Sequence, residues 1–290
     1  YKFSKKIKNE ILELINFFSF KKKIIRNAKY LKTDFNFLNF VTEKISIFMS
    51  ELCGDEKKID LVGFHGNTIV HDPKKNISVQ LGDPKILAKK INIPVVANFR
   101  SRDIKNLGEG APLVPIYHKA IFSKPKKNII VVNIGGISNF TFLIGKTDII
   151  ASDIGPGNTL IDKFCLMRFN KYFDKNGLIA SKGKVNYDLV NGWMKKKIFK
   201  KKPPRSFDTK NFNLKNFSQK NGISNHNFIR SLTFFSAKLI SELQIKFKKI
   251  DFWIFCGGGI HNLTLMREIK NLIGNRNVYV SDELGHDSAF

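Results

Sequence analysis

Apolar positions follow two different patterns along the chain. Before about Leu52 they recur at helical spacing, as in the stretch Ile7–Phe18. From Ile59 onward, short apolar runs end in glycines or polar turns, which is typical of strands. We expect strands near 59–64, 78–81, 93–99, 129–136, 138–144, 149–153, 252–256 and 277–280, and helices near 85–91, 115–122, 160–169, 227–247 and after 259. Alternating strands and helices predict an α/β architecture.

The basic, proline-containing stretch Lys124–Asn128 suggests a linker between two halves. It predicts a first lobe over residues 1–123 and a second over residues 124–290. Residues 195–227 are basic and irregular, and the lysine runs Lys195–Lys197 and Lys200–Lys202 are expected to be solvated.

The charge of the chain is strongly positive, with 50 Lys and Arg against 24 Asp and Glu and a net charge of +26. Only 8 of the 50 cations are Arg, and the lysines are spread from Lys2 to Lys270. Proteins that read nucleic acids specifically rely on Arg and gather their charge on one face. The pattern favours a lysine-rich surface over a nucleic-acid interface, although a basic nucleic-acid-binding protein stays as a remote alternative.

The sequence holds no apolar run of roughly 18 or more residues, so it predicts no membrane span. The three cysteines, Cys53, Cys165 and Cys256, are far apart and form no paired metal-ligand spacing. Such cysteine usage suits a reducing compartment, and we expect a cytoplasmic protein with no metal site made by its own residues.

Three strand-to-glycine turns are the main chemical signal. They carry Gly135 and Gly136, then Gly155, Gly157 and Asn158, and finally Gly257, Gly258 and Gly259, with Asn262 positioned to cap the helix that follows. Backbone N–H groups approach phosphate oxygens where no Cβ intervenes, and a helix N-terminus adds a favourable dipole. Each turn could equally be structural, but three of them together favour a nucleotide site.

Several polar residues at strand ends are candidates for chemistry. Asp153 could position a metal, accept a proton or cap the turn that follows it. His65 could bind substrate, although a loop hydrogen bond is the favoured interpretation for it alone. Arg100, Arg102 and Asp103 could grip an anionic or hydroxylated ligand or form a surface ion pair. The thiol of Cys256 is expected to pack inside a strand.

These segments, in order, resemble the anhydro-N-acetylmuramic acid kinase family of the acetate and sugar kinase, Hsp70 and actin superfamily. The stretches that carry the resemblance are Gly63-Phe-His-Gly-Asn-Thr68, Gln80-Leu-Gly-Asp-Pro84, Asn98-Phe-Arg-Ser-Arg-Asp103, Gly110-Ala-Pro-Leu-Val-Pro115, Asn133-Ile-Gly-Gly-Ile-Ser-Asn139, Asp153-Ile-Gly-Pro-Gly-Asn158, Lys202-Pro-Pro-Arg-Ser206, Cys256-Gly-Gly-Gly259 with Asn262, and Asp282-Glu-Leu-Gly285.

The resemblance implies a two-lobed actin/hexokinase-like fold of ribonuclease H-like domains, with ATP and Mg²⁺ in a cleft between the lobes. It implies phosphorylation of O6 of 1,6-anhydro-N-acetylmuramic acid with hydrolytic opening of the anhydro ring, in peptidoglycan recycling. Asp153 matches the family's catalytic base. The glycines of the three turns, with Asn158 and Asn262, would line the nucleotide. Candidates for the sugar side are His65, Thr68, Arg100, Arg102, Asp103 and Glu283.

The chain also departs from the family pattern. Asn67 stands where family members usually have Gln, and Ile154 where they have Thr. The family's Gly-Thr-Ser-x-Asp-Gly phosphate loop does not occur before Ile59, and the family's terminal helix would follow Phe290. We therefore expect a fragment, which could be inactive alone. Another sugar or hydroxy-acid kinase of the superfamily is the main alternative, and the resemblance also suggests a homodimer.

Overall fold

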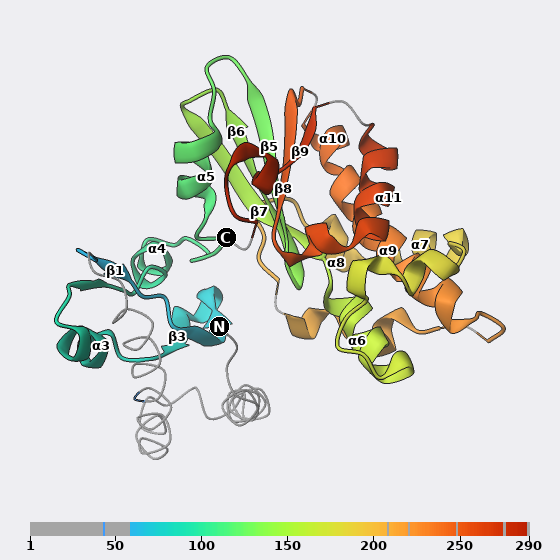
Figure 1. Ribbon diagram of the computed structural model, residues 1–290, viewed down its shortest axis with the longest axis horizontal. Helices are drawn as coiled ribbons and strands as arrows, with labels where there is room; N and C mark the ends of the chain where they lie inside the picture. Colours follow the sequence, from blue (N-terminus) through green and yellow to red (C-terminus); the bar gives the residue numbers. More distant parts are fainter. Residues whose placement is uncertain are drawn as a thin grey trace. The chain divides into compact units, whose positions relative to one another are not determined.

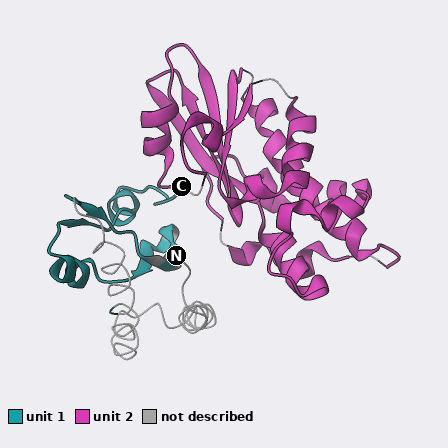
Figure 2. Ribbon diagram, in the orientation of Figure 1, with its two compact units in different colours: residues 1–111 teal, residues 112–290 magenta. Residues whose placement is uncertain are grey.

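The computed structural model describes Glu43 and residues 59–207, 209–219, 221–247, 249–274 and 277–288. The helix expected at Ile7–Phe18 lies outside these residues. The chain forms two compact units, residues 1–111 and 112–290, coloured separately in Figure 2. No helix in the described part of the chain is long and apolar enough to cross a membrane.

Unit 1 contains two small sheets in its described part. Strand β1 (Val62–Gly63) pairs in parallel with β4 (Val95–Val96), and β2 (Asn67–Asp72) pairs antiparallel with β3 (Ile77–Leu81). Its helices are η2 (Pro73–Lys75), α3 (Pro84–Ile91) and α4 (Ser101–Lys105). The core is small, with Val62, Phe64, Leu81 and Leu87 buried together.

Helix α3 begins as its sequence predicts. Asp83 is the N-cap, and its carboxylate accepts a hydrogen bond from Lys85 N at 2.7 Å, while Pro84 occupies the first turn. A side-chain oxygen at this position satisfies one of the unpaired N–H groups of a helix start.

Unit 2 is built on a five-stranded mixed sheet, in the order β7-β6-β5-β8-β9 (Figure 1). Strands β5 (Asn128–Ile134), β6 (Ile137–Ile144) and β7 (Asp148–Pro156) are antiparallel neighbours. Strands β8 (Phe252–Cys256) and β9 (Val278–Val280) extend the sheet in parallel beside β5.

Helices surround this sheet. The α-helices are α5 (Pro115–Phe122), α6 (Thr159–Phe169), α7 (Tyr187–Met194), α8 (Lys197–Lys200), α9 (Asn225–Ser241), α10 (Leu243–Lys246) and α11 (Leu263–Ile273). Short 3-10 turns are η3 (Lys175–Gly177), η4 (Ala180–Lys182), η5 (Thr209–Asn211), η6 (Leu214–Phe217), η7 (Gly258–His261) and η8 (Ser281–Leu284). The predicted α/β class is confirmed.

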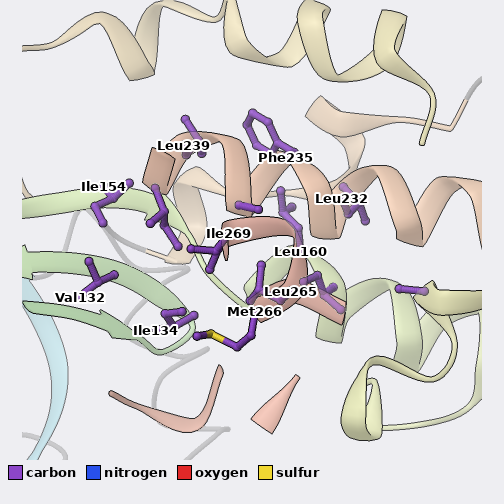
Figure 3. Packing of buried hydrophobic residues seen from close by; sticks show 14 of the residues in the cluster. Val132, Ile134, Ile154, Leu160, Leu232, Phe235, Leu239, Leu265, Met266 and Ile269 are labelled. Carbon is purple, nitrogen blue, oxygen red and sulfur yellow. The ribbon is translucent and has the colours of Figure 1, made fainter. Parts of the chain in front are cut away.

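The sheet of unit 2 buries apolar residues on both faces, because side chains alternate along each strand. On β5, Val132 and Ile134 enter the large cluster that α9 and α11 cover, while Ile129 and Val131 pack with Phe122 of α5 on the other face. Figure 3 shows Val132, Ile134 and Ile154 of the sheet lying with Leu239, Phe235 and Leu265 of the helices.

The division between the units differs from the predicted linker. Helix α5 belongs to unit 2, where Phe122 is buried against the sheet, and the division falls at Ala111/Pro112. The stretch Lys124–Asn128 therefore joins α5 to β5 inside one unit, and Asn128 N donates to Asp251 Oδ2 at 2.8 Å there. The predicted lobes, residues 1–123 and 124–290, depend on that linker signal, whereas unit 2 includes α5 because Phe122 packs on its sheet.

Candidate functional site

Asp153 lies near the end of β7, beside an irregularity in the strand pairing. Asn139 pairs with Asp153 and Ser138 pairs with Gly155, so Ile154 is the extra residue of a β-bulge. Bulges bend a strand and redirect its side chains. As a result, Ile154 and Gly155 both face the buried cluster.

The carboxylate of Asp153 is 8 % exposed and is held by the backbone of a distant segment. Its Oδ2 accepts a hydrogen bond from Phe207 N at 2.7 Å, and its own N–H donates to Arg205 O at 3.0 Å. An oriented carboxylate at a strand end is suited to accept a proton.

The first two glycine turns are bound to each other. Gly136 O accepts from Gly157 N at 2.9 Å and from Thr159 N at 3.1 Å, and Gly135 O accepts from Asn158 N at 2.9 Å. A Cβ on Gly157 would lie 2.4 Å from Gly135 O, so close backbone contact explains this glycine. The amides of residues 157–159 thus donate to the carbonyls of the first turn, and Gly136 of that turn is exposed.

Gly155 and Gly259 are explained by packing. A Cβ on Gly155 would lie 2.8 Å from Leu239 Cδ1, and one on Gly259 would lie 2.2 Å from Ile134 Cγ2. Both residues are buried, so each lets a helix or strand approach closely. Their role as nucleotide contacts stays a prediction.

The third turn contains one glycine with a positive φ, Gly257, and one with open space around it, Gly258. Gly257 has φ +82°, and its N–H donates to Ser288 O at 2.7 Å. Gly258 is exposed, with open space where a Cβ would stand. Asn262 caps α11 as predicted, because Leu265 N donates to its Oδ1 at 3.0 Å. The exposed Gly258 and the start of α11 form the part of this turn that a phosphate group could approach.

In unit 1, Arg100 connects His65 to the glycine-rich loop. Its Nε donates to His65 Nε2 at 2.9 Å, and its Nη1 donates to Gly110 O at 2.6 Å. Burial, and then the Arg100 charge, lower the pKa of His65. A neutral ring with the proton on Nδ1 is the form that accepts from Arg100.

Asp103 holds the other side of the same peptide. Its Oδ2 accepts from Gly110 N at 2.7 Å, so Arg100 and Asp103 together position the Gly110 backbone. The structure therefore gives these two residues a loop-holding role, and their contact with a ligand stays a prediction. Arg102 is exposed on α4.

A pocket of about 200 Å³ lies beside His65 in unit 1. Its lining residues are Phe64, His65, Ser78, Val79, Gln80, Gly82, Pro84, Ala97 and Asn98. Thr68 is close to it through Gln80 Nε2, which donates to Thr68 Oγ1 at 3.4 Å. Sequence reasoning did not select Ser78, Gln80 or Asn98, although Gln80 and Asn98 stand in the stretches that carry the family resemblance.

Glu283 lies in unit 2, unlike the other candidates for the sugar side. It is exposed in η8, and its Oε2 accepts from Val280 N at 3.0 Å. This bond stabilises the start of η8, and a contact with sugar stays a prediction.

No group of three or more His, Cys, Asp or Glu that could hold a metal ion occurs among the described residues. Cys165 and Cys256 are buried, and burial raises the pKa of both thiols to about 12. These thiols are therefore packing groups at neutral pH, as expected for Cys256.

Comparison with known proteins gives a consistent result. The family model described as "Anhydro-N-acetylmuramic acid kinase" matches residues 1–290. Curated proteins of that name are 38 % identical over 246 residues in Rhodopseudomonas palustris (strain ATCC BAA-98 / CGA009), with 84 % of this chain and 66 % of that protein covered. In Clostridioides difficile (strain 630) the identity is 38 % over 249 residues, with 79 % and 64 % covered.

The chain thus spans slightly less than two thirds of the length of these relatives. Among solved structures, xylulose kinase from Rhodospirillum rubrum is 10 % identical, with 69 % of this chain and 48 % of that chain covered and a TM-score of 0.38. A TM-score at this level does not inform the site.

Proposed function

Since the chain belongs to the anhydro-N-acetylmuramic acid kinase family, we propose that the protein phosphorylates O6 of 1,6-anhydro-N-acetylmuramic acid with ATP. In the same reaction water opens the anhydro ring, which yields N-acetylmuramic acid 6-phosphate for cell-wall recycling. The single observation that carries this proposal for the chain's own residues is the buried, oriented carboxylate of Asp153 at the end of β7.

Asp153 is proposed as the general base. Its ionised carboxylate would take a proton from the water that attacks the anomeric carbon, while O6 receives the γ-phosphoryl group. Phe207 N–H holds Oδ2 in place, and a fixed carboxylate reaches the transition state with little reorganisation.

Unit 2 is proposed to supply the nucleotide side through its glycine turns. Gly136 and Gly258 are exposed, and Gly258 precedes the capped start of α11. These are the backbone positions where phosphate oxygens could approach most closely.

Mg²⁺ is proposed to arrive with the ATP phosphates, where it would neutralise charge on the transferred group. Mg²⁺ commonly keeps several waters and is bound by only one or two carboxylates besides phosphate.

Unit 1 is proposed to supply the sugar side. The pocket beside His65 carries Ser78, Gln80 and Asn98, whose hydroxyl and amide groups suit a hydroxylated ligand. Arg100 and Asp103 would act by holding the Gly110 loop. We place the reaction in the cytoplasm, with ATP and the sugar as partners, a homodimer as the assembly, and neither nucleic acid nor membrane as a partner.

The test is a pair of Asp→Asn variants in the full-length protein that carries this chain. Asp153→Asn should lower kcat by about 10²- to 10⁴-fold, the usual contribution of a general base. Asp148→Asn is the matched control, because Asp148 is exposed at the opposite end of the same strand. Production of ADP and of the 6-phosphate is measured for both. Wild-type turnover in Asp153→Asn would refute the assignment.

A further inference from the structure

Strand β7 is at the edge of the five-stranded sheet, so its outer N–H and C=O groups need partners from elsewhere. The segment 205–207 supplies some of them, at Ser152, Asp153 and Ile154. Asp153 N donates to Arg205 O at 3.0 Å, and Arg205 N donates to Ser152 Oγ at 2.9 Å. A loop from a distant part of the sequence therefore lies along β7 at the β-bulge.

The guanidinium of Arg205 joins this loop to the strand. The side chain is 4 % exposed, and it donates to four backbone carbonyls. Nε donates to Asp153 O at 3.0 Å and Nη2 to Ile154 O at 2.7 Å on the strand. Nη1 donates to Phe199 O at 2.8 Å in α8 and to Lys201 O at 2.7 Å at the C-cap of α8, just before the loop. One planar group thus fixes both partners at once.

Phe207 N–H, which donates to Asp153 Oδ2, lies two residues after Arg205. Its ring packs against Phe212 and lies under the guanidinium, 5.1 Å from ring centroid to Arg205 Cζ. The position of this N–H donor therefore depends on where Arg205 is anchored. The same anchor controls the bulge from which the Asp153 side chain emerges.

We infer that Arg205 is a positioning residue for the reaction: it orders the segment 205–207 along the β7 edge and thereby orients the Asp153 carboxylate. The inference rests on the proposed function, because it takes Asp153 as the base. It adds a residue whose effect is exerted through Asp153 and not through contact with substrate.

The positive charge of Arg205 also supports the role of Asp153 as a base, in addition to the hydrogen bonds. Burial lowers the pKa of Arg205, and its interaction with Asp153 opposes that shift. Lys246 of α10 also interacts with Arg205: burial, followed by the Arg205 charge, lowers the pKa of Lys246, while Glu242 raises it. A cation beside a carboxylate favours its ionised form. Loss of the Arg205 charge should therefore move the acidic limb of the activity profile to higher pH.

The experiment compares three variants with Asp153→Asn in the full-length protein. Arg205→Gln removes the charge, Arg205→Lys keeps it with a different geometry, and Ser152→Ala removes only the hydroxyl that accepts from Arg205 N. Ser241→Ala is the control, since Ser241 is also buried and bonds only Lys238 O within α9. Values of kcat, KM and the pH profile are measured per folded molecule, with folding checked by circular dichroism.

We expect kcat to fall about 10- to 100-fold in Arg205→Gln and Arg205→Lys and about 10-fold in Ser152→Ala, with each KM within about threefold, because small misplacement of a reacting group is costly. The acidic limb should move up by about one pH unit only in Arg205→Gln. If Arg205→Gln does not fold, the kcat values of Ser152→Ala and Arg205→Lys test the positioning role.

The positioning role would be overturned if Ser152→Ala and Arg205→Lys kept the wild-type kcat and pH profile while Asp153→Asn was inactive. The proposed function would then stay intact. Turnover at the wild-type rate in Asp153→Asn would instead remove the base assignment, and the inference with it. A purely structural role would lower the melting temperature without changing kcat per folded molecule.

Discussion

Arg205 in unit 2 and Arg100 in unit 1 use the same chemistry in different surroundings. Each guanidinium donates to at least one backbone carbonyl and so orders a loop beside a candidate catalytic or binding residue. Arg205 is almost fully buried with four carbonyl partners, whereas Arg100 is half-buried and bonds one carbonyl and one imidazole.

This difference indicates that the surrounding core determines how much the hydrogen bonds of such an arginine contribute to stability. Unit 2 buries apolar residues on both faces of a five-stranded sheet, while the described part of unit 1 has two small sheets and a core of four buried residues. Buried polar bonds matter more where water cannot replace them. We expect Arg205 to control folding and geometry, and Arg100 to control mainly the local loop.

The largest predicted effect tests this contrast directly. Arg205→Met should lower the free energy of unfolding by about 3 to 5 kcal/mol, because buried carbonyls lose a charged donor. Arg100→Met should cost about 1 kcal/mol, since water can reach its partners. Urea unfolding of both variants measures the two losses. Equal losses would show that the two anchors do not differ in this way.

The second prediction concerns the electrostatic cost of burial in unit 2. Burial, followed by the nearby Asp174 charge, raises the pKa of Asp162 to about 6, although Asp162 lies in the first turn of α6, where a negative charge is favoured. Because the folded-state pKa is above the usual 3.8, the folded state binds more protons between those values, and stability falls as pH rises through them.

Asp162→Asn removes this cost. The variant should be more stable than the wild type at pH 7 by about 1 to 2 kcal/mol, since Asp162 is only partly buried and water screens part of the cost. The gap should close below about pH 3, where Asp162 is protonated in both the folded and the unfolded wild type. Thermal unfolding across this pH range measures it. A gap that does not change with pH would contradict the assigned cause.

The smallest effect is predicted in unit 1. The pKa of His65 is lowered, so below about pH 6.5 the unfolded chain binds a proton that the folded chain resists. Stability is therefore lost as pH falls through that value. His65→Gln keeps an acceptor for Arg100 without a titrating group. It should remove the part of the pH dependence that comes from His65, which is a loss of under about 1 kcal/mol in the free energy of unfolding between pH 7 and pH 5.

Unfolding of His65→Gln and wild type at pH 7 and pH 5 provides the comparison, with His226→Gln as the control because His226 lies on α9 of unit 2. If stability depended more strongly on pH through His65 than through Asp162, the contrast between the units would be reversed.

Much of the fold was predictable from local pattern. Strand β8 begins and ends where the apolar run Phe252–Cys256 predicts, and Asp83 and Asn262 cap their helices as their positions indicate. Local signals were weaker at Lys124–Asn128, where a basic, proline-containing stretch is a turn inside unit 2. Whether such a stretch links two units depends on what the preceding helix packs against, which the stretch itself does not encode.

The candidate site was predictable in part. The position of Asp153 at a strand end follows from the apolar run before it, but the β-bulge depends on pairing with β6 and the Phe207 N–H comes from a segment far along the chain. Likewise, Gly155 and Gly136 stand in similar glycine turns, yet one faces Leu239 and the other is exposed. Spacing indicates that a glycine is needed without indicating which neighbour requires it.

The sequence by itself determined the α/β class, the helix caps and the ordered motifs that the family match later bore out, because each depends on residues close together in the chain. Only the tertiary structure decided that Arg205, which the motif Lys202–Ser206 places in a basic, irregular stretch, is buried on the edge of β7. Its two partners on β7, Asp153 O and Ile154 O, lie 52 and 51 residues earlier in the chain, and a contact over that separation depends on the completed sheet and not on local preference.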